Sequence, residues 1–309
     1  MKFWLLHSLA VSTRPVLGVS SIDNEIFVLY WSASYTCLNY YDHDVQSSLL
    51  KIGVYSASTF ESERHAEIPV KMRGSVRRTH QSQNKHTLTA CSHNKCLFVS
   101  DKNNCIVHNV SARMKKTPIS QWSTESPPSG LSMNSAHNVL VACGDDHMFL
   151  EYTSNGSLVQ KINLRSDIEN PVQVVQLCSG RYGIIHQGST PGYSVIDHNG
   201  KVINRYTRPE RKFLFDRVFS ERDTDVLRAP CALAVLRPRK VLIVDQKNNR
   251  ILALTETENS FTAKRLPESV CDELNQPSCM HYDASRRRLY IGEYDSGEND
   301  GCRVLCYKI

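Results

Sequence analysis

Short apolar runs separated by polar turns recur along the whole chain. The clearest example is "VLIVDQKNNRILAL", Val241–Leu254, in which two apolar runs flank a polar turn. A similar stretch, "CLFVSDKNNCIVHNV", lies earlier at Cys96–Val110. Short runs rich in β-branched and aromatic residues, bounded by turn residues, are typical of β-strands, and no stretch shows convincing helical periodicity. The pattern therefore predicts an all-β protein.

The same arrangement repeats along the sequence. When the units are aligned on the end of one apolar run, they are marked by Tyr30, Asp101, Cys143, His186, Asp245 and Glu293. The usual spacing is about forty residues, with longer insertions in places, which suits a repeating four-stranded unit. A shorter apolar stretch precedes each run, and proline opens it at Pro128, Pro171, Pro230 and Pro277. Proline fits the first residue of a strand, where its missing N–H costs no ladder bond.

Repeats of this kind close into a ring more readily than they form two domains, because radial repetition protects the sheet edges. We expect one domain over residues 1–309, with units at approximately 15–70, 87–122, 128–165, 171–206, 228–266 and 274–309. The sequence ends inside the third strand of the last unit, so we expect residues 3–9, "FWLLHSL", to supply its outer strand. The predicted fold is a six-bladed β-propeller of four-stranded antiparallel blades, closed by the N- and C-terminal strands.

The segment "LRAPCALAVLRPRKVLIVDQKNNRILAL", Leu227–Leu254, resembles an NHL repeat. The second unit, "VSDKNNCI", resembles one too, but its turn reads as one residue short and lacks the arginine. The NHL family forms six-bladed propellers, so the resemblance implies one here. In proteins of the TRIM-NHL type, such a propeller follows RING, B-box and coiled-coil segments. This sequence has no zinc-spaced Cys/His array and no sustained heptads, so its residues do not support ligase activity.

We expect the repeated turn to be structural. Asparagine tolerates the left-handed backbone that such turns require. Asp245 and Arg250 flank the turn of the fifth unit and are expected to form an exposed ion pair, worth about 0–1 kcal/mol. The turn residues are Asp101, Asn103 and Asn104 in the second unit and Asp245, Asn248, Asn249 and Arg250 in the fifth.

Composition indicates a globular protein in a reducing environment. With 40% hydrophobic residues, a packed core is expected, and no apolar run is long enough to span a membrane. The eleven cysteines are scattered, and several lie in apolar runs (Cys96, Cys143 and Cys178), where a free cysteine behaves as a buried hydrophobe. We therefore expect a reduced, cytoplasmic protein. His7 and Ser8 interrupt the N-terminal apolar stretch, which favours a strand over a signal peptide.

Three insertions depart from the repeat, and propeller topology brings all of them to one face. They are Trp31–Ser48, Lys71–Lys85 and Tyr206–Arg228. Arginine beside aromatic residues is typical both of protein-interface hot spots and of RNA-binding surfaces, although a solvated charged loop has the same composition. The binding-face candidates are Arg73, Arg77, Arg78, Arg208, Arg211, Lys212, Phe213, Phe215, Tyr40 and Tyr41.

The charge pattern favours a protein partner over RNA. The net charge of +6 permits an anionic partner without demanding one. Acidic turns separate the basic clusters, and a face of alternating sign suits protein recognition better than a continuous nucleic-acid track. These acidic residues are Asp145, Asp146, Glu293, Asp295, Glu298 and Asp300, whereas the run Arg286–Arg288 falls on the opposite face.

An enzyme of the propeller type needs acids, amides or histidines converging on the ring axis. The inner strands instead offer Ser20, Thr89, Ser132, Gln173, Ala234 and His281, a poor ligand set. Asp145-Asp146-His147 is expected to be a solvated turn. The prediction is thus a monomeric, non-catalytic, protein-binding module without metal, cofactor or membrane contact. The alternatives are RNA binding and, further off, a metal-dependent lyase or lactonase.

Overall fold

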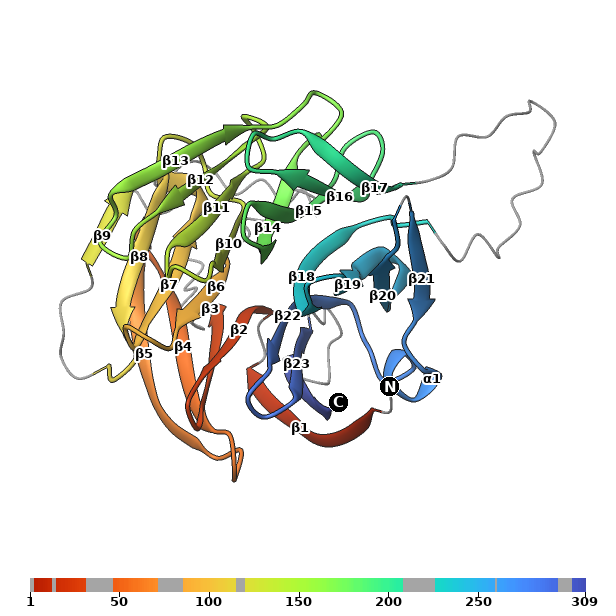
Figure 1. Cartoon of the computed structure of the whole chain (residues 1–309). Coiled ribbons are helices and arrows are strands. Elements are labelled where there is room, and N and C mark those ends of the chain that lie inside the picture. Colours follow the sequence, from red (N-terminus) through yellow and green to blue (C-terminus); the bar gives the residue numbers. More distant parts are fainter. Residues whose placement is uncertain are drawn as a thin grey trace, which may run out of the picture.

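The computed structural model describes residues 3–12, 15–31, 47–71, 86–114, 120–207, 226–258, 260–293 and 302–309. The strands form antiparallel sheets of four strands each, and these six sheets stand as blades around a ring (Figure 1). The predicted six-bladed β-propeller is therefore confirmed. Among the described residues the one α-helix is the short α1 (Glu268–Cys271), which precedes the last blade.

Each of the first three blades runs from its inner to its outer strand in chain order. Blade one contains β2 (Val16–Ile22), β3 (Glu25–Trp31), β4 (Ser47–Ser56) and β5 (Ser62–Lys71). Blade two contains β6 (Leu88–Cys91), β7 (Cys96–Asp101), β8 (Ile106–Ser111) and β9 (Ser120–Ser123). Blade three contains β10 (Gly130–Met133), β11 (Val139–Cys143), β12 (Met148–Tyr152) and β13 (Leu158–Asn163).

The next two blades follow the same order. Blade four contains β14 (Pro171–Cys178), β15 (Arg181–His186), β16 (Gly192–Asp197) and β17 (Val202–Thr207). Blade five contains β18 (Pro230–Arg237), β19 (Lys240–Asp245), β20 (Arg250–Glu256) and β21 (Phe261–Arg265). The predicted strand-opening prolines Pro171, Pro230 and Pro277 are the first residues of β14, β18 and β22. The prediction for Pro128 was wrong, because β10 begins two residues later, at Gly130.

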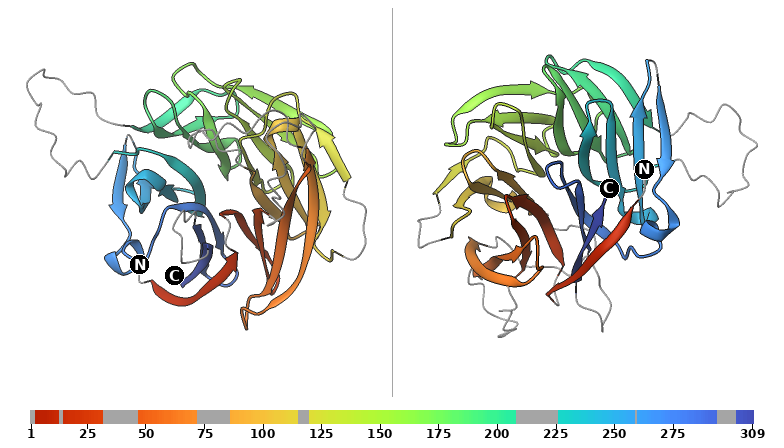
Figure 2. Two further views of the ribbon diagram at one scale, coloured as in Figure 1. Left: turned by 180° about the vertical axis from the view of Figure 1, so that it is seen from behind. Right: turned by 60° about the horizontal axis from the view of Figure 1, so that its bottom comes forward.

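Blade six joins the two ends of the chain. It contains β22 (Pro277–Asp283), β23 (Arg288–Glu293), β24 (Cys302–Lys308) and, as its outer strand, β1 (Trp4–Ser12). β1 pairs antiparallel with β24, with Trp4 opposite Lys308 and Leu9 opposite Val304. Figure 2 shows the red N-terminal strand alongside the dark blue C-terminal strand. The predicted closure of the ring by the N-terminal apolar run is confirmed.

The inner strands β2, β6, β10, β14, β18 and β22 contact one another in succession around the ring. The strands approach one another closely at Gly130, where a Cβ atom would collide with the carbonyl oxygen of Val172 on the next inner strand. Glycine is therefore required there by backbone proximity rather than by its own conformation.

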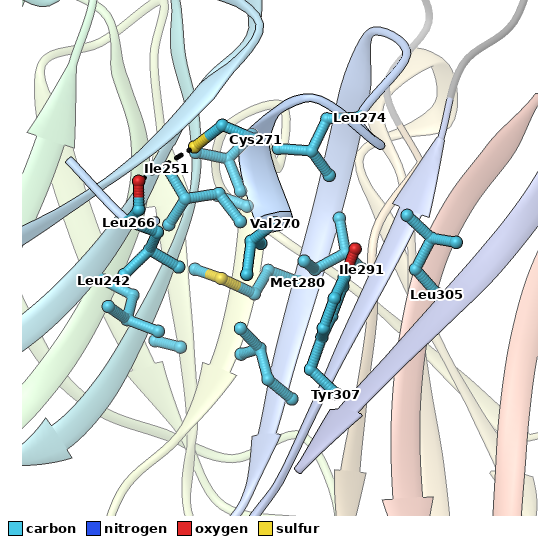
Figure 3. Packing of buried hydrophobic residues seen from close by; sticks show 14 of the residues in the cluster. Leu242, Ile251, Leu266, Val270, Cys271, Leu274, Met280, Ile291, Leu305 and Tyr307 are labelled. Atoms are coloured by element: carbon cyan, nitrogen blue, oxygen red, sulfur yellow. Dashed lines mark hydrogen bonds between the residues drawn. The ribbon is translucent and has the colours of Figure 1, made fainter. Parts of the chain in front are cut away.

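The hydrophobic core is divided among the blade interfaces. Six clusters of buried residues each combine side chains from two neighbouring blades. Figure 3 shows the cluster between blades five and six, where Val270 of α1 packs among Leu242, Ile251 and Ile291. Because both faces of a blade are covered, a central strand such as β11 is buried at every position. This explains why its sequence is a continuous apolar run instead of an alternating one.

Ten of the eleven cysteines lie in the described part of the chain. Cys96 and Cys143 are buried, as predicted, but Cys178 is exposed at the end of β14. The prediction for Cys178 was wrong because the apolar stretch ends one residue earlier, at Leu177, where the chain turns into the next strand. No helix within the described ranges is long and apolar enough to cross a membrane.

Candidate functional site

Strand order divides the connections between two faces of the ring. The insertion face carries the turns from second to third strands and the connections between blades; the hairpin face carries the other turns. Residues 32–46, 72–85, 208–225 and 294–301 all connect strand ends on the insertion face and lie outside the described residues. The predicted binding-face residues Arg73, Arg77, Arg78, Arg208, Arg211, Lys212, Phe213, Phe215, Tyr40 and Tyr41 fall in these segments, as do Asp295, Glu298 and Asp300.

The chain re-enters the scaffold at Val226 through a buried polar network. The Asp245 carboxylate accepts hydrogen bonds from the backbone N–H groups of Arg228 and Ala229, at 2.9 and 3.0 Å. Its second oxygen accepts from Asn248 at 2.5 Å and from Arg250 at 3.1 Å. Asn248 and Arg250 in turn donate to the carbonyl oxygen of Val226. The network therefore fixes the segment that leads into β18.

The expectation that Asp245 and Arg250 form an exposed pair was wrong. Their side chains are 0% and 6% exposed, and the guanidinium and carboxylate lie 3.1 Å apart. The connection that follows residues 208–225 covers them, which the local turn sequence does not reveal. A covered ion pair is held by its hydrogen bonds, and removing one partner leaves an uncompensated charge.

The two similar turns have the same length, contrary to the sequence alignment. Asp101 pairs with Ile106 across one hairpin, and Asp245 pairs with Arg250 across the other. Both turns contain a short 3₁₀ helix followed by one left-handed residue, Cys105 at φ 54° or Asn249 at φ 48°. Asn104 thus corresponds to Asn248, and each donates to the aspartate that begins its turn. Asn103 has no such bond and corresponds to Lys247.

Two buried histidines flank the first of these turns. His86 and His108 are 2% and 4% exposed, and His108 Nε2 lies 3.7 Å from the Asp101 carboxylate. Burial lowers the pKa of His86, although its hydrogen bond to the Ser100 carbonyl opposes the shift. Burial alone would raise the pKa of Asp101, but the nearby His108 imidazole and the hydrogen bonds from Asn104 bring it below its usual range. The group stabilises blade two just beneath the connection from blade one.

A third buried histidine, His186, ends β15 on the same face. Its Nε2 lies 3.2 Å from Ser194 Oγ. Burial lowers the pKa of His186 to about 4, and the Arg205 guanidinium acts in the same direction. Arg205 itself pairs with Asp167 at 3.0 Å. The imidazole is therefore neutral in the folded protein at physiological pH.

The free energy of unfolding should fall as the pH decreases from about 6.5 to 4. In this range His186 is protonated in the unfolded chain but stays neutral in the folded protein. The contribution of His186 is roughly 3 kcal/mol above pH 6.5 and is lost progressively toward pH 4. His186→Gln should give a shallower decline over this range, measured by urea unfolding at several pH values. His93→Gln, at an exposed position, is the control and should keep the wild-type decline. Equal slopes for wild type and His186→Gln would contradict the assignment.

The acidic residues on the insertion face differ in their surroundings. Asp145, Asp146 and His147 are exposed, as predicted for a solvated turn, and Asp145 pairs with Lys102 at 3.3 Å. Glu293 is 1% exposed and accepts hydrogen bonds from Arg303 at 2.6 Å and from the backbone of Asn275 at 2.8 Å. The interpretation of Glu293 as a surface charge was therefore wrong, since it anchors the segment that enters β22.

Polar side chains of the inner strands are engaged in bonds between blades. Ser132 donates to the carbonyl oxygen of Val174 at 2.5 Å. Gln173 donates to the Leu131 carbonyl and accepts from the Leu233 amide, so that it joins three successive blades. These side chains hold the ring together.

A serine, a histidine and an aspartate meet where the inner strands of blades six and one adjoin. Ser21 Oγ lies 2.9 Å from His281 Nε2 and donates to Asp283 at 3.2 Å. In a catalytic triad the carboxylate binds the imidazole nitrogen that faces away from the nucleophile. Here the carboxylate binds the serine itself, and burial lowers the pKa of His281 to about 4, which makes it a weak base. The cluster links the closing blade to the first one.

Sequence reasoning placed His281 on the inner strand but missed this contact. Ser21 and Asp283 come from opposite ends of the chain, so local spacing gave no signal. Across the described ranges, no group of three or more His, Cys, Asp or Glu side chains is arranged to hold a metal ion.

Comparison with solved structures adds an independent view of the fold. The chain is similar to a catalytically inactive virginiamycin B lyase from Staphylococcus aureus with quinupristin, at 10% identity and a TM-score of 0.57 over 100% of both chains. It is also similar to a streptogramin B lyase, at 14% identity and 0.55 over 99% of this chain and 97% of that one. A third similar structure is U3-55K, at 12% identity and 0.58 over 97% of each chain.

What is shared is a β-propeller. At these identities the likeness shows the fold alone, and one fold can serve proteins with unrelated roles. No family model matches the chain, and no curated protein matches it. The NHL resemblance therefore stays a prediction.

Proposed function

We propose that the chain is a non-catalytic interaction propeller that binds a protein partner through its insertion face. One observation carries the proposal: the segments that depart from the repeat leave and re-enter the scaffold on one face, beside buried polar anchors such as the network of Asp245, Asn248 and Arg250. Binding residues commonly lie in loops carried by a rigid scaffold.

The engagement of inner-strand side chains supports a scaffold role over a lyase role. In a propeller enzyme the side chains near the axis would be directed at substrate or metal. Here Ser132 and Gln173 bind neighbouring backbones instead. The Ser21–His281–Asp283 cluster likewise joins two blades.

The proposal is tested by reversing the charges predicted to bind. Arg208→Glu/Arg211→Glu/Lys212→Glu in the full chain should lose most of the proximity-labelled protein partners that wild type collects. The matched control is Arg113→Glu/Lys201→Glu/Lys264→Glu, which changes three exposed cations outside the insertions and should keep these partners. An unchanged partner set in the first variant would refute the proposal.

RNA is the second candidate, favoured by the arginines and phenylalanines in the insertions. If RNA is the ligand, wild type should retain pooled RNA at physiological salt, and the affinity should fall steeply as salt rises. Retention that the Arg208/Arg211/Lys212 variant loses would support RNA in place of protein. No retention by wild type would remove the RNA candidate.

A further inference from the structure

We propose that the hairpin face of blades five and six is a second interaction surface, which binds an acidic peptide segment of a protein partner. The surface consists of Arg237, Arg239, Lys240 and Arg287, called here the hairpin-face cation cluster. It lies on the opposite side of the ring from the insertion face and does not depend on the function proposed above.

The four cations come from two neighbouring turns. Arg237 and Lys240 are opposite each other in the register of the β18–β19 hairpin, at its turn end, and Arg239 lies in the turn between them. Arg287 occupies the turn between β22 and β23. These strands lie side by side in the ring (Figure 1). Leu236 and Tyr282, which precede the two turns, pack against the same hydrophobic cluster. The two turns therefore form one continuous part of the surface.

The three arginines of the run Arg286–Arg288 have different surroundings. Arg286 pairs with Asp283 at 3.1 Å. Arg288 donates to the carbonyl oxygen of Ala57 in blade one and lies over the Phe60 ring, 5.6 Å from its centroid. Arg287 is exposed at φ 53°, and the described residues offer it no ion-pair partner. Arg286 and Arg288 are therefore held by contacts within the fold, whereas Arg287 is exposed to solvent.

The cluster carries uncompensated positive charge. Arg237, Arg239 and Arg287 are exposed and Lys240 is half-buried, and none of the four has an ion pair within the ranges that the structure describes. Two carboxylates of these blades are already used: Glu256 binds Arg181 at 2.6 Å, and Asp283 binds Arg286. The exposed Glu258 in the β20–β21 turn offsets only part of the charge of the four cations. Several cations of one sign on a small area attract an anionic partner and steer its approach.

The extent of the positive surface favours a peptide over a nucleic acid. On the side of blade four, Arg181 is neutralised by Glu256. On the side of blade one, Glu25 and Asp23 are paired with Arg64 and Lys95. The positive area therefore ends after two hairpins and offers no long track for a phosphate backbone. Half-buried Leu236 and Tyr282 add apolar contact area between the cations, which suits a side chain within an acidic segment.

The test uses the full chain and a fluorescein-labelled peptide of glutamate and aspartate residues with one leucine and one tyrosine. Fluorescence anisotropy at about 0.15 M ionic strength should show saturable binding to wild type. Arg237→Glu/Arg287→Glu should weaken the Kd about tenfold or more. The matched control Arg113→Glu/Lys201→Glu reverses two exposed cations in other turns of the same face and should leave the Kd unchanged.

Three results would overturn the proposal: no binding to wild type, equal weakening in both variants, or a Kd unaffected by Arg237→Glu/Arg287→Glu. Titration with single-stranded RNA distinguishes the ligand class, since tighter RNA binding lost in the same variant would make nucleic acid the occupant. Peptide binding that survives in the Arg208→Glu/Arg211→Glu/Lys212→Glu protein separates this surface from the insertion face. Melting temperatures of all variants confirm that they fold.

Discussion

Asp245→Ala is expected to lower the free energy of unfolding by about 3–5 kcal/mol, because it leaves the Arg250 guanidinium buried without its counter-charge. The substitution also removes the acceptor for the backbone N–H groups of Arg228 and Ala229. Urea unfolding followed by circular dichroism measures the loss, as a lower midpoint at unchanged slope.

Asp145→Ala is the matched control for this effect. Asp145 lies in the turn between the second and third strands of blade three, but its side chain is 56% exposed and its partner is the half-buried Lys102. A solvent-exposed pair contributes about 0–1 kcal/mol. If Asp245→Ala costs no more than Asp145→Ala, the buried network does not anchor the connection into β18.

Leu9→Asp is expected to cost about 3–5 kcal/mol, because it places a charge in the cluster between blades six and one and weakens the strand that closes the ring. Leu9 is 9% exposed and faces Val304 of β24. Urea unfolding gives the cost, and hydrogen exchange should show that the β24 amides facing β1 lose protection.

Leu5→Asp makes the same change on the same strand at a side chain that is 44% exposed. It should cost less than about 1 kcal/mol, as most surface substitutions do. Similar losses at Leu5 and Leu9 would show that the strand acts through its backbone pairing and not through the buried face of Leu9.

The blade pattern could be predicted because its physical cause is local. Both faces of a blade are covered, so each second strand is a continuous apolar run, and the end of that run marks the register. Pro230 and Pro277 mark the inner strands for an equally local reason, the absence of a backbone donor. The exposure of Cys178 could not be predicted in this way. Cys178 is the last residue of its run, and the turn that follows decides whether such a residue faces the core or solvent.

The repeated turn was misaligned for a reason that the backbone makes clear. Aligning the two Asn-Asn dipeptides matches Asn103 and Asn104 with Asn248 and Asn249, which makes the second-unit turn look one residue short. What the two turns share is a left-handed position at fixed distance from the aspartate, filled by Cys105 in one and Asn249 in the other. Backbone conformation is conserved between the repeats where side-chain identity is not.

Contacts between distant parts of the chain were beyond sequence reasoning. Ser21 reaches His281 and Asp283 only because the ring closes there. The covering of Asp245 by the connection into blade five, and the pairing of Glu293 with Arg303, are equally matters of tertiary structure. The binding residues expected in the insertions remain predictions for the variants proposed above.

The pairing of β1 with β24 also sets the order in which the protein can be completed. Trp4 cannot meet Lys308 until all the residues between them have been synthesised, so β1 waits longer for its partner than the other described strands do. Until then Leu9 lacks the blade-six part of its cluster, which includes Val304 and Cys306 of β24. Contacts of such sequence separation slow folding and expose the nascent chain to aggregation. We therefore expect the pairing of β1 with β24 to be a late step in folding.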